Sequence, residues 1–271
     1  MRRIDFVKTV ASGNDFVLIR HSSVLSKINP QSLAKILCNR KFGIGADGLL
    51  LLGDSKKADV RMRIFNPDGS EAQMCGNGAR CVAFYLAHRT KGKGKFSMET
   101  KAGIIKSEVF KDNVKIKLTL PVDIRLKQPL KIAGRILKIN FIDTGVPHTV
   151  VFVEGLDKID VLGLGRFIRY HRRFSPQGTN VDFVEPLDNS VISIRTYERG
   201  VEDETLACGT GAVASALIFA VSWPRSSSSK IEVLTKSNEK LKVYFKRDKD
   251  RFEDVWLEGK ARIVFEGRLN L

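Results

Sequence analysis

The sequence predicts an α+β protein with two pseudo-symmetric domains from internal duplication, each a mostly antiparallel β-sheet or barrel wrapped around a central apolar helix. Three features of the 271 residues lead to this fold class. Segments of the first half recur in order in the second half, short apolar runs alternate with turn residues, and each half holds one strongly apolar helix-like run. A doubly wound fold would instead alternate strands and helices regularly.

The internal repeat is the strongest of these features. Four pairs of positions match in the same order, each at an offset of 132 or 133 residues: Gly13 and Gly145, Gly45 and Gly178, Phe65 and Tyr197, and Cys75 and Cys208. One such similarity would be weak, but four that agree within one residue indicate duplication of a unit of roughly 130 residues.

The elements of the first half follow from local patterns. Apolar runs predict strands at 15–20, 48–52 and 60–65, and residues 66–70, NPDGS, predict a tight turn. Residues 29–40 predict a helix that has Asn29 as N-cap and Pro30 at its first position. The side chains expected on the inner side of this helix are Leu33, Ile36, Leu37 and Cys38.

Each half continues with a glycine-rich turn, an apolar helix and hairpin-like strands. The charge-free run 206–223 has the length of a membrane span, but glycines occupy its first third. The remaining dozen or so helical residues are too few to cross a bilayer. We therefore expect a buried central helix, because a helix that is apolar on every side belongs in a protein core.

The repeat also predicts the domain limits. We expect an N-terminal domain of residues 1–120 that carries Cys75 and a C-terminal domain of residues 121–261 that carries Cys208. The last strand-like residues, 262–271, are expected to return to the first sheet.

Composition excludes several classes of protein. The 43% hydrophobic and 28% charged residues are those of a folded globular chain. The net charge of +16 raises the possibility of nucleic-acid binding, but the basic runs 91–95 and 246–251 lie at expected turns, and no basic helix or aromatic RNA motif is present. We expect solvated basic surfaces, no specific nucleic-acid partner and no membrane association.

The four cysteines indicate neither a disulfide framework nor a metal site, since they form no C-x-x-C pair and have no histidine at metal-ligand spacing. The N-terminal residues lack a continuous apolar stretch, so we expect no signal peptide and a cytoplasmic protein.

Chemistry is expected at Cys75 and Cys208, each of which precedes a Gly-x-Gly turn at the start of an apolar helix. A helix N-terminus favours a thiolate, and its exposed backbone N–H groups can bind a carboxylate. Two such turns facing one substrate would let one thiolate remove an α-proton while the other thiol returns a proton to the opposite face. No cofactor is needed, and the two thiols should titrate as a coupled pair.

Cysteines at such positions have other common roles. A single buried cysteine is usually a small core residue, which is our expectation for Cys38 and Cys81. A redox pair is usually a C-x-x-C neighbour pair, and neither Gly-x-Gly turn completes a dinucleotide-binding pattern. Duplication favours the catalytic interpretation for Cys75 and Cys208, because packing alone does not require cysteine at equivalent positions.

The two halves also differ next to their matched turns. The second half has Glu198-Arg199 where the first has Asn66-Pro67, and Asn14 and Asn180 lie on matched loops. Arginine can bind a carboxylate with two hydrogen bonds, and glutamate can accept from an ammonium group. A substrate with an amino acid at each end would explain this asymmetry, although a surface ion pair would also fit.

Together these motifs resemble the diaminopimelate epimerase family, whose members interconvert LL- and meso-2,6-diaminopimelate without a cofactor, in lysine and peptidoglycan precursor biosynthesis. The resemblance covers nearly the whole chain. The stretches that carry it are GNDFVLI (13–19), GIGADGLL (43–50), RIFNPDGSEAQMCGNGARC (63–81), PQGTNVDFV (176–184), YERGVEDETLACGTGA (197–212) and VWLEGKARIVFEG (255–267).

The resemblance implies a role for each matching residue. Cys75 and Cys208 would be the acid and base, and His148 and Glu198 would assist them. The reacting α-carboxylate would be held by the two turns, at Gly76, Asn77, Gly209 and Thr210. The rest of the substrate would be bound by Asn14, Asn66, Asn180, Glu198 and Arg199. The resemblance also implies a homodimer.

Two residues depart from the family pattern: Val146 stands where members often have asparagine, and Gly48 where some have glutamine. The substrate contact of residue 146 is then lost or taken by water. The alternatives are a proline or hydroxyproline racemase, which would not need Glu198 and Arg199; a phenazine-pathway isomerase, against which Cys75 argues; and a basic nucleic-acid-binding protein.

Overall fold

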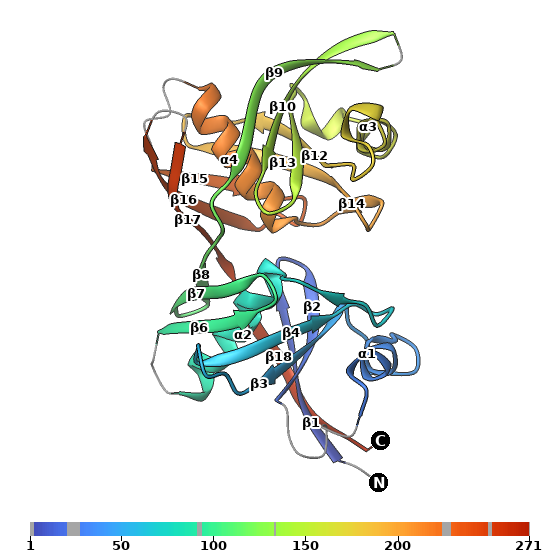
Figure 1. The fold of residues 1–271 in the computed structure, drawn as a ribbon, viewed down its shortest axis with the longest axis vertical. Coiled ribbons are helices and arrows are strands. Elements are labelled where there is room, and N and C mark those ends of the chain that lie inside the picture. The colour runs from blue at the N-terminus through green and yellow to red at the C-terminus, as the bar shows by residue number, and fades with distance from the viewer. Residues whose placement is uncertain are drawn as a thin grey trace. The chain divides into compact units, whose positions relative to one another are not determined.

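The structure is a computed structural model that describes residues 3–20, 28–90, 94–132, 134–223, 229–248 and 251–270. The chain divides into two compact units, Met1–Lys117 with Gly259–Leu271, and Leu118–Glu258 (Figure 1). The predicted basic turns at 91–95 and 246–251 lie partly outside the described residues.

The first unit contains eleven elements among the described residues: β1 (Arg3–Ala11), β2 (Asn14–Arg20), α1 (Pro30–Cys38), β3 (Gly48–Gly53), β4 (Val60–Phe65), β5 (Glu71–Ala72), α2 (Gly76–Arg89), β6 (Lys95–Thr100), β7 (Gly103–Phe110), β8 (Asn113–Lys117) and β18 (Arg262–Asn270). Its strands pair in the order β18-β1-β2-β3-β4-β6-β7-β8, with the short β5 also on β4. The pairs β2–β3 and β4–β6 are parallel, and the other pairs are antiparallel.

The second unit repeats this order with β9 (Val122–Ile132), β10 (Arg135–Asp143), β11 (Pro147–Phe152), α3 (Val161–Arg169), β12 (Asn180–Pro186), β13 (Val191–Glu198), β14 (Asp203–Thr205), α4 (Gly209–Ser222), β15 (Lys230–Leu234), β16 (Lys240–Asp248) and β17 (Arg251–Lys260). The last two residues of β17, Gly259 and Lys260, belong to the first unit. Two short 3-10 helices, Leu156–Lys158 and Arg172–Phe174, flank α3. The strand order is β9-β10-β11-β12-β13-β15-β16-β17, with β14 on β13, and β11–β12 and β13–β15 are parallel.

The two units therefore share one topology, which confirms the predicted duplication and fold class. Two parallel pairs occur at equivalent places in each otherwise antiparallel sheet. In the first sheet, β18 from the end of the chain takes the place that β9 takes in the second. Two pairs of matched glycines support the repeat: Gly13 and Gly145, and Gly45 and Gly178, all have a positive φ between 66° and 98°. Residues with a side chain rarely adopt this conformation.

The central helices α2 and α4 each contact most strands of their own sheet. In α4, residues 211–220 are all buried, as expected for a helix that is apolar on every side. In α2, burial covers only residues 77–83, and the later turns are half-buried or exposed. The first turns of both helices, which follow the two cysteines, are thus fixed in a core.

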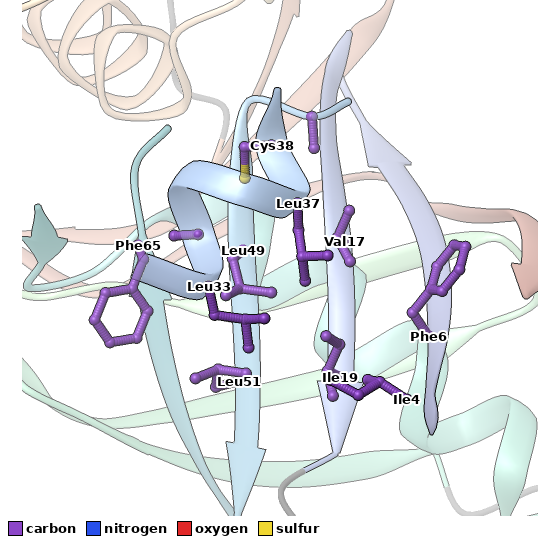
Figure 2. Close-up of a cluster of buried hydrophobic side chains, with 12 residues drawn as sticks. Ile4, Phe6, Val17, Ile19, Leu33, Leu37, Cys38, Leu49, Leu51 and Phe65 are labelled. Atoms are coloured by element: carbon purple, nitrogen blue, oxygen red, sulfur yellow. The ribbon is translucent and has the colours of Figure 1, made fainter. Parts of the chain in front are cut away.

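The outer helix α1 packs on β1, β2, β3 and β4 of the first unit (Figure 2). Asn29 caps it as predicted, since its Oδ1 accepts from the Gln31 N–H at 2.8 Å. The expected inner face was wrong at one position. Ile36 is 52% exposed, and Ala34 is buried in its place. In the second unit, α3 packs on a corresponding cluster that includes Val181 and Phe183.

Among the described residues, none of the helices is both long and apolar enough to cross a membrane.

Candidate functional site

In the first unit, Cys75 lies at the N-terminus of α2. Its backbone is extended, its carbonyl accepts from the Ala79 N–H at 2.9 Å, and its Sγ accepts from the Gly78 N–H at 3.4 Å. A Cβ on Gly78 would lie only 3.0 Å from Leu50 Cδ2, so glycine lets this turn approach β3 closely. The thiol is only partly buried. It therefore lies at the positive end of a helix dipole, where a thiolate is favoured.

Two of the predicted binding residues lie together beside this turn. Asn77 is 5% exposed and donates through Nδ2 to Asn14 Oδ1 at 3.0 Å. Asn14 in turn donates to Asp47 Oδ2 at 2.8 Å. The loop after α1 and the start of β2 thus support the helix start that contains Gly76 and Asn77.

Asn66 occupies the turn between β4 and β5. Its Nδ2 donates to Ser70 Oγ at 2.9 Å, and its backbone N–H donates to the Ser70 carbonyl at 2.8 Å. The side chain is exposed. Since β5 ends at Ala72, three residues before Cys75, this turn and the cysteine belong to the same short connection.

In the second unit, Cys208 takes the equivalent place before α4. Its carbonyl accepts from the Ala212 N–H at 2.9 Å, and its Sγ lies 3.4 Å from Thr210 Oγ1. Burial raises the pKa of the Cys208 thiol well above its usual value, and the negative charges of Glu198 and Asp182 raise this pKa further. Hydrogen bonds from Thr210 and the Gly211 N–H act in the opposite direction.

This environment predicts slow alkylation of Cys208. A raised pKa means a smaller thiolate fraction at pH 8, so iodoacetamide should modify Cys208 more slowly than a free thiol. The rate should still be rising above pH 9, where the rate for an ordinary cysteine levels off. Peptide mass spectrometry across pH 7–10, with a short cysteine peptide blocked at both ends as the reference thiol, measures this. A Cys208 rate that follows the reference thiol across this range would contradict the prediction.

Next to α4, a histidine and a carboxylate form a fully buried pair. His148 Nδ1 lies 2.8 Å from Asp182 Oδ2, and Asp182 Oδ1 accepts from Thr196 Oγ1 at 2.7 Å. The other ring nitrogen, His148 Nε2, has no hydrogen-bond partner among the described residues. A Cβ on Gly211 would lie 2.4 Å from Asp182 Oδ1, so the glycine lets the start of α4 lie against this pair.

Glu198 ends β13 and is the charged neighbour of this group. Burial raises the pKa of Glu198, and the negative charge of Asp182 adds to the effect, whereas His148 lowers it. Glu198 is therefore close enough to raise the pKa of Cys208, and its own pKa responds to the charges of Asp182 and His148.

The remaining predicted residues of the second unit lie on one loop system. Asn180 Oδ1 accepts from the Arg199 N–H at 2.8 Å, and Asn180 Nδ2 donates to the Pro147 carbonyl at 3.1 Å. Arg199 Nη1 donates to the Gln177 carbonyl at 3.3 Å. Asn180 thereby joins the Arg199 turn to the strand that carries His148.

Sequence reasoning missed Asp182, which orients His148. Its signal was a single acid within the apolar run of 181–184. It also missed Asp47, which binds Asn14 and lies in the matched segment 43–50. Among the described residues, no group of three or more histidine, cysteine, aspartate or glutamate side chains is placed to hold a metal ion.

The sequence of this chain matches a known protein family over most of its length. The sequence model of diaminopimelate epimerase matches residues 6–122 and 140–264. The diaminopimelate epimerase of Aquifex aeolicus is 42% identical over 279 residues, which cover 98% of each chain. That of Archaeoglobus fulgidus is also 42% identical, covering 99% of this chain and 97% of the relative.

Solved structures share the fold at low sequence identity. A phenazine biosynthesis protein of the PhzF family from Bacillus anthracis superimposes with a TM-score of 0.77 at 20% identity, covering 100% of both chains. A hydroxyproline epimerase from Agrobacterium vitis superimposes with a TM-score of 0.72 at 13% identity, covering 99% of this chain and 92% of that one. The full-length sequence similarity is decisive: this chain belongs to the diaminopimelate epimerase family.

Proposed function

We propose that the protein interconverts LL- and meso-2,6-diaminopimelate by proton transfer at one α-carbon, with Cys75 and Cys208 as the acid and base and no cofactor. One observation carries the proposal: a cysteine precedes the equivalent central helix in both units of the duplicated fold. The two diaminopimelate epimerases that are 42% identical over nearly the full chain support the choice of substrate.

The reaction requires both thiols to reach one α-carbon from opposite faces. One begins as thiolate and the other as thiol, so each turnover exchanges their protonation states. The backbone N–H groups of the two turns, at Gly76 and Asn77 and at Gly209 and Thr210, would stabilise the charge that develops on the α-carboxylate.

The units are not equivalent around their cysteines, and this suits a substrate with two different ends. The buried pair His148–Asp182 and the carboxyl of Glu198 lie near Cys208, where they would guide its proton exchange. We assign binding of the non-reacting amino acid end to Asn14, Asn66, Asn180, Glu198 and Arg199. Arg199 would bind its carboxylate, and Glu198 its ammonium group.

The test follows LL-diaminopimelate incubated with the enzyme in D2O, under reducing conditions and without added cofactor. Formation of the meso isomer with deuterium at one α-carbon is the expected result, read by NMR and chiral chromatography. Proline is the comparison substrate, since it has a single amino acid end. Exchange of proline without turnover of diaminopimelate would refute the proposed substrate, and no exchange with either would refute the proposed reaction.

We further propose a cytoplasmic homodimer. Sedimentation equilibrium should then give a mass of twice the 30.3 kDa of one chain, and a mass of 30.3 kDa at micromolar concentration would contradict the dimer.

A further inference from the structure

A buried arginine lies under the turn that follows Cys75. Arg80, on the second turn of α2, has a relative exposure of 0% and is among the largest fully buried side chains. Its Nη2 donates to Asn77 Oδ1 at 2.6 Å and to Ser12 Oγ at 2.7 Å, and its Nη1 donates to the Lys260 carbonyl at 3.4 Å. Burying a guanidinium group is costly, so a position that retains one needs a reason beyond packing.

The hydrogen bonds give Arg80 a specific effect on its neighbours. A guanidinium group can only donate, so Asn77 must turn its oxygen toward Arg80 and its NH2 group away. That NH2 group donates to Asn14 Oδ1. The NH2 group of Asn14 then points the other way and donates to Asp47 Oδ2. A donor-only group at one end and a carboxylate at the other thus fix the orientation of both amides.

The opposite end of this chain is itself held by charge. Asp47 accepts from Arg40 at 2.7 Å, and Arg40 also binds Asp15 at 2.8 Å. The Arg40 guanidinium and the Lys8 ammonium hold the pKa of Asp15 well below its usual value, against the opposing effect of burial. The amide chain therefore runs between two anchored groups and has little freedom to rotate.

At the positions that correspond to this amide chain, the described part of the second unit has different residues. At the offset of 133 residues that relates Cys75 to Cys208, Arg80 corresponds to Val213 and Asn77 to Thr210. Val213 is buried and apolar. The buried pair near Cys208 is instead His148–Asp182. The helix starts are alike, but a buried arginine supports one and a buried histidine–aspartate pair lies beside the other.

We propose that Arg80 is a positioning residue: it fixes the side-chain amides of Asn77 and Asn14, and through them the carboxylate-binding turn beside Cys75. This role rests on the proposed function, because Asn77 and Asn14 are the groups that would meet the substrate. In this role Arg80 acts through Asn77 rather than on the substrate itself.

The kinetic test uses Arg80→Met, which keeps the apolar length of the side chain but removes the donors. We expect kcat/KM for LL-diaminopimelate to fall roughly 10- to 100-fold, with the larger change in kcat, because misplaced groups lose transition-state stabilisation before they lose binding. Arg80→Lys keeps a charged donor and should recover part of the loss. The control is Val82→Ala, a buried truncation on the same helix, which should lower stability but leave kcat/KM within about threefold of wild type.

A double-mutant cycle separates positioning from general destabilisation. If Arg80 acts through Asn77, adding Arg80→Met to an Asn77→Ala enzyme should lower kcat/KM by less than about threefold. The amide that Arg80 positions is already absent from that enzyme. Equal fold-losses in both backgrounds would overturn the proposal. So would an Arg80→Met enzyme whose loss matches that of Val82→Ala.

An NMR readout is independent of the substrate. In ¹⁵N spectra, the side-chain NH2 signal of Asn77, assigned by its absence in Asn77→Ala, should shift in Arg80→Met and remain in place in Val82→Ala. An unshifted signal in Arg80→Met would refute the positioning role even if wild type fails to turn over diaminopimelate. That failure alone would refute only the proposed function.

Discussion

Replacing either Cys75 or Cys208 by alanine should lower kcat/KM for diaminopimelate epimerisation by at least about 10³-fold, because each turnover needs both a base and an acid. A positioned acid or base contributes up to roughly 10⁴-fold, and here neither can be omitted. Neither single variant should incorporate deuterium and invert configuration in D2O. Loss in both variants distinguishes a two-thiol reaction from one in which a single cysteine shuttles the proton.

The matched control is Cys38→Ala. Cys38 is a buried thiol at the C-terminal end of α1, and burial raises its pKa to about 11. This substitution should keep nearly full activity while lowering stability. If Cys75→Ala or Cys208→Ala retains more than about a tenth of wild-type activity, the two-base assignment is wrong for that residue. Circular dichroism of each variant establishes that the activity lost is not a loss of folded protein.

The repeat made most of the fold predictable, because several of its matched residues are glycines in backbone conformations that other residues rarely adopt. Gly13 and Gly145 both adopt positive φ at equivalent turns, so the same local conformation recurs in both units. The helix α3 was not predicted, since the two glycines of VLGLGRFIR weaken its helix propensity. Its signal was present in Asp160, whose Oδ1 accepts from the Gly163 N–H at 2.9 Å as an N-cap.

The error at Ile36 shows what local pattern cannot decide. Leu33 and Leu37 are compatible with two inner faces, one that includes Ile36 and one that includes Ala34. The second was correct because α1 packs on β1 to β4, and the small Ala34 is fully buried there. Which face a short helix buries depends on the shape of the sheet beneath it, and the sheet is formed by distant segments.

The same limit applies to the candidate site. The cysteines were visible because they repeat, but the residues that support them do not. Arg80 corresponds to Val213, and Asp182, at the same offset, to Leu49. The role of Asp182 emerges only from strand register: β11–β12 pairing sets His148 against Asn180, and β12–β13 pairing sets Asp182 against Thr196. Long-range pairing thus creates the buried group, and local sequence does not encode it.

Asp182→Ala is expected to be the most destabilising substitution near Cys208. It removes the acceptor of both His148 Nδ1 and Thr196 Oγ1 inside a fully buried site. Breaking a buried polar pair at one partner costs about 3–5 kcal/mol, since the other partner stays desolvated. Urea unfolding followed by tryptophan fluorescence measures this loss of unfolding free energy. The signal comes from the unit that contains Asp182, because Trp223 and Trp256 both lie in Leu118–Glu258.

Asp182→Asn separates that structural effect from the chemical one. Asparagine keeps the shape and one acceptor, so the loss of unfolding free energy should stay below about 1.5 kcal/mol. Its NH2 group, however, can turn toward His148 and stabilise the tautomer with an unprotonated Nδ1, which reverses the donor and acceptor roles of the ring. We therefore expect kcat/KM to fall roughly 10- to 100-fold in a nearly fully stable protein. If Asp182→Asn has wild-type kinetics, the His148–Asp182 pair supports the fold but not catalysis. If Asp182→Ala has wild-type stability, the pair does not stabilise the fold either.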